Sequence, residues 1–122
     1  MEKKILVVDD EAGIREIIQF NLENAGFEVD CACSAEEALE KLGQEHCLIL
    51  LDVMMPKING FEVCKEIRTY SQVPIIMLTA RGNERDELMG FEYGVDEYIS
   101  KPFSPKILVA RVEAILKRVQ GN

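Results

Sequence analysis

The chain has 122 residues, with 14 basic against 22 acidic side chains, a formal net charge of −8 and a pI near 4.7. This length suits one domain with one hydrophobic core, and 48% apolar with 30% charged residues is typical of a globular protein. The negative field repels nucleic acid and anionic lipid, and no apolar run approaches the ~20 residues of a membrane span. We therefore expect a single cytoplasmic domain over residues 1–122, with no direct contact to nucleic acid or membrane.

The first half of the chain alternates between strand and helix patterns. Residues 5–8 form a short apolar run, which is typical of a strand covered on both faces of a parallel sheet. A helical stripe follows and ends before Gly26; its members are Ile14, Ile17, Ile18, Leu22 and Ala25. Residues 27–33 alternate between apolar and polar side chains, which predicts a half-exposed edge strand. Ser34 and Glu37 then have the spacing of a capping box, which predicts the start of a second helix.

The second half continues the alternation. Residues 48–51 and 75–78 are further unbroken apolar runs, and residues 97–100 complete a set of five strands. Further helices are expected over residues 61–68, 84–92 and from Pro105 onward, the last with a core stripe of Leu108, Val112, Ile115, Leu116 and Val119. Strand and helix alternating through short connections predict a doubly wound α/β fold with a five-stranded parallel sheet and five helices.

The cysteine spacing predicts neither a disulfide framework nor a zinc site. The single histidine, His46, is isolated by spacing from all four cysteines, and no C-x-x-C pair exists among Cys31, Cys33, Cys47 and Cys64. We expect reduced, half-buried thiols.

Polar residues stand where the predicted strands end. Asp9 and Asp10 follow the first strand, Asp52 the third, Thr79 ends the fourth and Lys101 the fifth. The carboxyl ends of parallel strands share one edge, so these residues should meet in one crevice. Each has an ordinary structural explanation by itself, such as a helix cap, a turn residue or a solvated charge. Their joint placement favours a site.

The charges of this crevice predict a metal ion. Three carboxylates facing one lysine leave about two uncompensated negative charges, and close like charges repel by several kcal/mol. A divalent cation relieves that repulsion, and hard oxygen ligands favour Mg²⁺ over Zn²⁺, with Mn²⁺ expected to substitute.

Five motifs in order identify a family. The stretches KILVVDDE, LILLDVMMP, NGFEV, IIMLTARG and DEYISKPFSP resemble the receiver domain of two-component response regulators over essentially the whole chain. The likeness is greatest to the branch with a winged-helix DNA-binding domain, the OmpR/PhoB-like branch. It implies a flavodoxin-like sheet with strand order 2-1-3-4-5.

The resemblance also assigns chemistry to the site. It implies that Asp52 accepts a phosphoryl group from a sensor histidine kinase, with the Thr79 hydroxyl and the Lys101 ammonium binding phosphoryl oxygens. The implied Mg²⁺ ligands are Asp9, Asp10, Asp52 and the backbone carbonyl of Met54.

Three further features follow from the same resemblance. The family couples the threonine hydroxyl to an aromatic ring at the position of Tyr98, which turns inward when the phosphoryl group is bound. It usually has a cis peptide bond after the lysine, here between Lys101 and Pro102. Met54 and Arg81 occupy the two positions that tune the lifetime of the phosphoryl group.

The family resemblance predicts a homodimer, formed on phosphorylation through the fourth helix, fifth strand and fifth helix. The residues expected on that face are Glu87, Asp96, Glu97, Ile107, Arg111 and Arg118. Asp96 would pair with Arg118, and Glu97 with Arg111, across the two-fold axis. The family commonly has a basic residue at position 87 and an acidic one at 107, so one ion pair is missing here and the dimer should be weaker or reshaped.

Four functional alternatives differ in class. The first is a switch that controls DNA through a C-terminal domain absent from this chain, and the second is a stand-alone single-domain receiver of a phosphorelay. A phosphatase with an aspartate nucleophile is disfavoured because it needs a second aspartate two residues on, where this chain has Met54. A degenerate receiver that never takes phosphate is disfavoured because all five site residues are present.

Overall fold

A computed structural model describes residues 4–52, 60–80 and 94–120 of the chain. A parallel sheet lies at its centre with the strand order β2-β1-β3-β4-β5. The strands are β1 Lys4–Val8, β2 Glu28–Ala32, β3 His46–Asp52, β4 Ile75–Ala80 and β5 Glu97–Lys101. The doubly wound fold and the strand order predicted from the sequence are confirmed.

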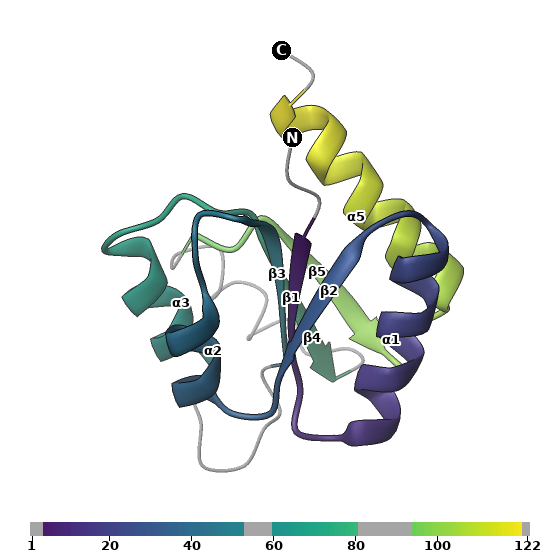
Figure 1. Ribbon diagram of the computed structural model, residues 1–122, viewed down its shortest axis with the longest axis horizontal. Coiled ribbons are helices and arrows are strands. Elements are labelled where there is room, and N and C mark those ends of the chain that lie inside the picture. The colour runs from purple at the N-terminus through teal and green to yellow at the C-terminus, as the bar shows by residue number, and fades with distance from the viewer. Residues whose placement is uncertain (1–3, 53–59, 81–93, 121–122) are drawn as a thin grey trace.

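Helices cover both faces of the sheet (Figure 1). In the described ranges they are α1 Ala12–Asn24, α2 Ala35–Lys41, α3 Gly60–Arg68 and α5 Pro105–Gln120. Figure 1 shows α1 and α5 on one face and α2 and α3 on the other. The helix expected over residues 84–92 lies outside the described residues. Within the described ranges, no helix has the length and apolar character that a membrane crossing requires.

The apolar strands form the centre of the core. Residues 5–8 of β1 and 48–51 of β3 are fully buried. Their side chains alternate, so Leu6 and Val8 pack on the side of α2 and α3, while Ile5 and Val7 pack on the side of α1 and α5. Burial on both faces explains why these runs lack an alternating pattern.

Three residues placed in helical core stripes are exposed: Ile17, Ala25 and Val119. Ala25 is the C-cap residue of α1 and lies past its last turn. Ile17 of α1 is 49% exposed, and its neighbour Ile18 is 1% exposed. Consecutive helical residues point about 100° apart, so Ile18 faces the sheet and Ile17 does not. Val119 of α5 is 56% exposed. Figure 1 shows the last turn of α5 extending past the sheet, where no strand can cover it.

The ends of the first two helices have specific local causes. Gly26 has φ 98°, a left-handed conformation that other residues rarely adopt, and it follows the last turn of α1. The Ser34 hydroxyl accepts a hydrogen bond from the backbone N–H of Glu37 at 3.1 Å, which is the expected cap of α2. The Glu37 carboxylate accepts from the backbone N–H of Cys33 at 2.9 Å. The predicted capping box therefore forms, with its second bond shifted by one residue.

The edge strand β2 is tied to β3 by polar side chains. His46, whose side chain is 0% exposed, binds the Asp30 carboxylate through Nε2 at 2.8 Å. Its Nδ1 accepts from the backbone N–H of Gly43 at 3.0 Å, so Nε2 is the donor toward Asp30. Both ring nitrogens of the buried His46 thus have hydrogen-bond partners, so the residue has a structural role. All four cysteines are free, as expected.

Candidate functional site

The strand order fixes where a site can form. The chain runs from β1 to β2 on one side and then to β3 on the other side of β1, so the strand order reverses between β1 and β3. Ligands of doubly wound sheets bind at the carboxyl ends of the strands beside such a reversal. Asp9 and Asp10 directly follow β1, and Asp52 is the last residue of β3. The topology therefore brings these acidic residues together.

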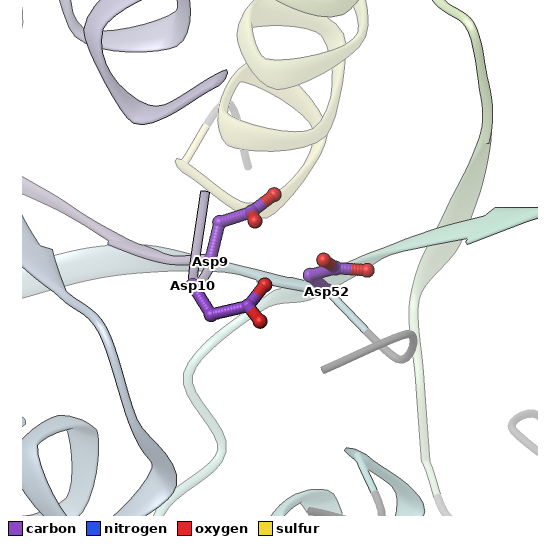
Figure 2. Close-up of side chains that lie close together, drawn as sticks. All are labelled: Asp9, Asp10 and Asp52. Atoms are coloured by element: carbon purple, nitrogen blue, oxygen red, sulfur yellow. The ribbon is translucent and has the colours of Figure 1, made fainter. Parts of the chain in front are cut away.

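The three carboxylates form a cluster. Figure 2 shows them grouped beyond the end of β1 and at the end of β3. One oxygen from each of Asp9, Asp10 and Asp52 lies within 4.8 Å of the others. Asp9 and Asp52 are 0% and 1% exposed, whereas Asp10 is exposed. The cluster thus has a buried floor and one side open to solvent.

Lys101, the last residue of β5, reaches both buried carboxylates. Its Nζ donates to Oδ2 of Asp52 at 2.9 Å and to Oδ2 of Asp9 at 3.2 Å. The lysine side chain is only 16% exposed, so water screens these ion pairs weakly. One ammonium group compensates one of the three negative charges.

The pKa directions reflect this crowding of charge. Burial raises the pKa of Asp9, the backbone N–H of Glu11 opposes the rise, and the charge of Asp52 adds to it. Burial alone would lower the pKa of Lys101. The hydrogen bonds and charges of Asp52 and Asp9 together outweigh that effect, so the pKa of Lys101 is raised. The site therefore favours the charged form of Lys101 and disfavours the charged form of Asp9.

The donor set fits a small, hard divalent cation. When all three carboxylates are ionised, two negative charges remain after Lys101 is counted. Carboxylate oxygens with access to water are the ligands that Mg²⁺ and Mn²⁺ prefer, whereas zinc sites prefer nitrogen and sulfur. Asp9, Asp10 and Asp52 would hold such an ion. A cation there removes the repulsion that the fold creates.

The other predicted site residues lie on neighbouring strands. Thr79 of β4 is 1% exposed and lies one position beyond Leu78, the register partner of Asp52. Tyr98 of β5 is 7% exposed and belongs to the core cluster on the side of α2 and α3. The peptide bond between Lys101 and Pro102 is cis. Met54, Arg81 and Glu87 lie outside the described residues, so the expectations attached to them stay predictions.

Two groups that hold the site, the backbone N–H of Glu11 and the guanidinium of Arg15, were not predicted from the sequence. The Asp9 carboxylate accepts a hydrogen bond from the backbone N–H of Glu11 at 3.0 Å. The sequence offered Asp9 and Asp10 as caps of α1, but neither is its N-cap residue. Glu11 is the N-cap residue of α1, and its own side chain makes no capping bond. Nη1 of Arg15 donates to the backbone oxygen of Asp9 at 2.6 Å. The position of Arg15 could have indicated this bond. Helical side chains lean toward the helix N-terminus, and Arg15 lies close to the N-terminus of α1.

Two acidic residues assigned to the dimer face, Glu97 at the start of β5 and Asp96 just before it, are paired within the chain. Oε2 of Glu97 accepts from Nη1 of Arg111 at 3.1 Å. Oδ2 of Asp96 accepts from Nη2 of Arg68 at 3.1 Å and from the backbone N–H of Ile75 at 2.8 Å. The predicted pairs across a two-fold axis would have to share or replace these bonds.

The exposed surface between β5 and α5 is partly apolar. Ile107 is 53% exposed and lines a groove with Glu97 and Arg111. Arg118 lines the adjoining part of the groove along α5. Four of the predicted dimer residues therefore line one surface: Glu97, Ile107, Arg111 and Arg118. Asp96 does not line this groove and forms an ion pair with Arg68.

Comparison with known proteins decides the family. The model of the response regulator receiver domain family matches residues 5–113. The chain belongs to this family. Receiver domains are regulatory phosphoacceptor domains of two-component systems that histidine kinases phosphorylate, and they bind Mg²⁺ at an acidic pocket. The cluster of Asp9, Asp10 and Asp52 is an acidic group that could hold such an ion.

Relatives place this receiver domain in the OmpR/PhoB branch. It is 52% identical over 120 residues to the alkaline phosphatase synthesis transcriptional regulatory protein PhoP of Bacillus subtilis, covering 97% of this chain and 50% of that protein. It is 50% identical over 115 residues to a CpxR homologue of Haemophilus influenzae, covering 94% of this chain and 51% of that protein. The chain thus spans about half the length of these curated relatives.

Solved structures agree with this placement. The response regulator DrrB of Thermotoga maritima, an OmpR/PhoB homologue, matches with a TM-score of 0.88 at 35% identity, covering 97% of this chain and 54% of that one. A CheY-like receiver domain protein of Methanospirillum hungatei matches with a TM-score of 0.90 at 29% identity, covering 99% of this chain and 98% of that one.

Proposed function

We propose that Asp52 accepts a phosphoryl group from a phosphohistidine of a sensor histidine kinase in the cytoplasm, and that this modification switches the receiver domain between two conformers. One observation carries the proposal. Asp52 is 1% exposed at the end of β3, is bound by Lys101 at 2.9 Å, and has an oxygen within 4.8 Å of oxygens of two further carboxylates. An aspartate in an ordinary ion pair has one partner of opposite charge, whereas Asp52 shares Lys101 with Asp9 and lies near two like charges, an arrangement that a bound cation would stabilise.

The proposed transfer step uses Asp52, Lys101, Thr79 and a divalent cation. A carboxylate oxygen of Asp52 attacks the phosphorus in line with the bond to the histidine nitrogen; that bond breaks, its electron pair returns to the imidazole, and an acyl phosphate forms. Mg²⁺, or Mn²⁺ in its place, would offset the charge of the phosphoryl oxygens while held by the three aspartates and the Met54 carbonyl. The ammonium of Lys101 moves from Asp52 to a phosphoryl oxygen, and the Thr79 hydroxyl binds another. The backbones of Asp52, Thr79 and Lys101 belong to strand ends, so only short side-chain movements would be needed.

The proposed switch connects Thr79 to Tyr98. Thr79 on β4 pairs in register with Ser100, two residues after Tyr98 on β5. Moving the Thr79 hydroxyl toward a phosphoryl group leaves more room behind it for the tyrosine ring. Tyr98 is 7% exposed in this structure, so the proposed turn of its ring would be a repacking within the core. Phosphorylation would then increase the population of an existing conformer rather than create one.

The proposed output is a homodimer through β5, α5 and the expected fourth helix. The exposed Ile107 would pack against its copy in the other chain. Ion pairs between the chains, from Asp96 to Arg118 and from Glu97 to Arg111, would share or replace the bonds within each chain. Glu87 and Ile107 remove one ion pair of the usual pattern, which costs ~0.2 to 1 kcal/mol. Transcription would be the regulated process, as the names of the regulators that this chain resembles suggest. The proposed route is a C-terminal DNA-binding domain outside this chain.

A second candidate is a stand-alone receiver of a phosphorelay. The observation that favours it is the match to 98% of the length of a CheY-like receiver domain protein. Both candidates share the chemistry at Asp52 and differ only in what reads the modified surface. The identity of about 50% to transcriptional regulators favours the first.

Intact mass measurement after incubation with acetyl phosphate tests the proposal. The wild-type chain should gain one phosphoryl group only when Mg²⁺ is present, and size-exclusion chromatography should show a larger dimer fraction in the modified sample. Asp52→Asn should gain nothing. Asp30→Asn, which removes an acid outside the site, should be modified like the wild type. No mass gain in the wild type, or an equal gain in Asp52→Asn, would refute Asp52 as the acceptor.

A further inference from the structure

All four hydrogen-bonding groups of Asp9 are engaged by different parts of the fold. Its backbone N–H donates to the carbonyl oxygen of Ala32 at 3.1 Å. Its Oδ1 accepts from the backbone N–H of Glu11 at 3.0 Å, and its Oδ2 from Nζ of Lys101 at 3.2 Å. Its backbone oxygen accepts from Nη1 of Arg15 at 2.6 Å. Among these bonds, only the one from Arg15 comes from a side chain that touches neither the carboxylates nor the proposed phosphoryl group.

The oxygen that Arg15 binds belongs to the peptide unit between Asp9 and Asp10. A peptide unit is planar, so holding its oxygen also restrains the N–H and Cα of Asp10, the atom from which the Asp10 side chain leaves the backbone. Arg15 lies near the start of α1 and is half-buried, and its guanidinium reaches back over the turn between β1 and α1. A short bond from a charged donor is among the stronger hydrogen bonds in proteins.

We propose that Arg15 is a positioning residue for the divalent cation: it fixes the Asp9–Asp10 peptide so that both carboxylates face Asp52. This inference rests on the proposed function, because it assumes that the acidic cluster binds Mg²⁺. Arg15 touches neither the ion nor the phosphoryl group. It acts through the backbone that carries two of the three carboxylates.

Charge and positioning predict opposite effects for the loss of Arg15. A guanidinium close to the cluster repels a second cation, so if charge were its only contribution, removing it would tighten Mg²⁺ binding. If Arg15 positions the carboxylates, removing it frees the peptide unit and weakens Mg²⁺ binding. The sign of the change therefore separates the two explanations.

The test is calorimetric titration of the full chain with MgCl₂. Arg15→Met should raise the Kd for Mg²⁺ by about tenfold, the low end of what outer ligand-orienting contacts contribute. Arg15→Lys keeps one charged donor and should raise it by less, about threefold. Arg68→Met is the matched control, since Arg68 also caps backbone oxygens, those of Ser71, Val73 and Gly94, but at the opposite ends of the strands. Its Kd should equal that of the wild type.

Phosphorylation kinetics add a second readout. With acetyl phosphate, Arg15→Met should need about tenfold more Mg²⁺ for half its maximal rate and should approach the wild-type rate when Mg²⁺ saturates. An unchanged or lower Kd in Arg15→Met, or an equal rise in Arg68→Met, would overturn the role of Arg15. A wild-type chain that binds Mg²⁺ but takes no phosphoryl group would instead refute the proposed function, and the comparison of Kd values would still decide on Arg15.

Discussion

Replacing Asp10 by Asn should stabilise the protein without Mg²⁺ and remove its response to Mg²⁺. Asp10 is exposed, and none of the side-chain hydrogen bonds within residues 4–52, 60–80 and 94–120 uses its carboxylate. The substitution therefore removes no hydrogen bond of the described residues. It does remove one of three negative charges whose oxygens lie within 4.8 Å of one another.

The expected magnitude follows from that separation. Two unit charges 4.8 Å apart repel by ~0.9 kcal/mol in water and by ~3.5 kcal/mol at an effective dielectric constant of 20. Because Asp10 is exposed and Lys101 offsets part of the repulsion, we expect a net gain of about 0.5 to 1 kcal/mol at low salt. This gain corresponds to a rise in Tm of roughly 2 to 5 °C for a chain of this size.

Thermal unfolding with and without MgCl₂ measures both effects. At a Mg²⁺ concentration tenfold above its Kd, the wild type should gain about 1.4 kcal/mol, whereas Asp10→Asn should gain far less. The order of the two Tm values should therefore reverse when Mg²⁺ is added. Glu113→Gln is the control, because it removes one negative charge from an exposed position on α5. The reasoning fails if Asp10→Asn is less stable without Mg²⁺, or if Mg²⁺ stabilises it as much as the wild type.

Three further predictions concern the rest of the charge and thiol chemistry. Lys101→Met leaves two buried carboxylates without their ammonium, so urea unfolding should show a loss of about 3 kcal/mol without Mg²⁺; a loss below about 1 kcal/mol would contradict the buried ion pairs. The hydrogen bond from His46 lowers the pKa of Asp30 below 3.8, so the stability that this carboxylate contributes is complete above about pH 4 and disappears as the pH falls through the lowered value. The difference in unfolding free energy between wild type and Asp30→Asn should therefore shrink from about pH 6 to about pH 3, and a constant difference would be inconsistent with this linkage. Burial raises the pKa of three thiols, so a thiol reagent at neutral pH should label the exposed Cys33 faster than the other three; equal rates in the folded protein would exclude that protection. The slow group is Cys31, Cys47 and Cys64.

The sequence predicted the sheet well because burial on both faces leaves a clear mark. Unbroken apolar runs occur where helices cover both sides of a strand, and residues 5–8 and 48–51 are fully buried as expected. The helical faces were less certain. The apolar pattern gave the correct buried face of α1 and α5. It could not show that Ile17 lies outside that face or that Val119 lies beyond the end of the sheet.

The candidate site was predictable only where strand ends define it. Asp9, Asp10 and Asp52 follow from the rule that parallel strands share one carboxyl edge, and the structure brings them within 4.8 Å of one another. Arg15 left no comparable pattern, because its bond is to a backbone oxygen, which every residue carries. The bond from Arg68 to Asp96 was missed because the partners are 28 positions apart and no spacing rule joins them.

The most direct test of the central claim is to locate the acyl phosphate on the chain. After incubation with acetyl phosphate and Mg²⁺, borohydride reduction followed by peptide mass mapping marks the carboxyl group that carried the phosphoryl group. The account predicts a single reduced residue, Asp52, which disappears when Mg²⁺ is removed with a chelator. Reduction at Asp9 or Asp10 instead, or modification of Asp52 that is independent of the metal, would contradict it.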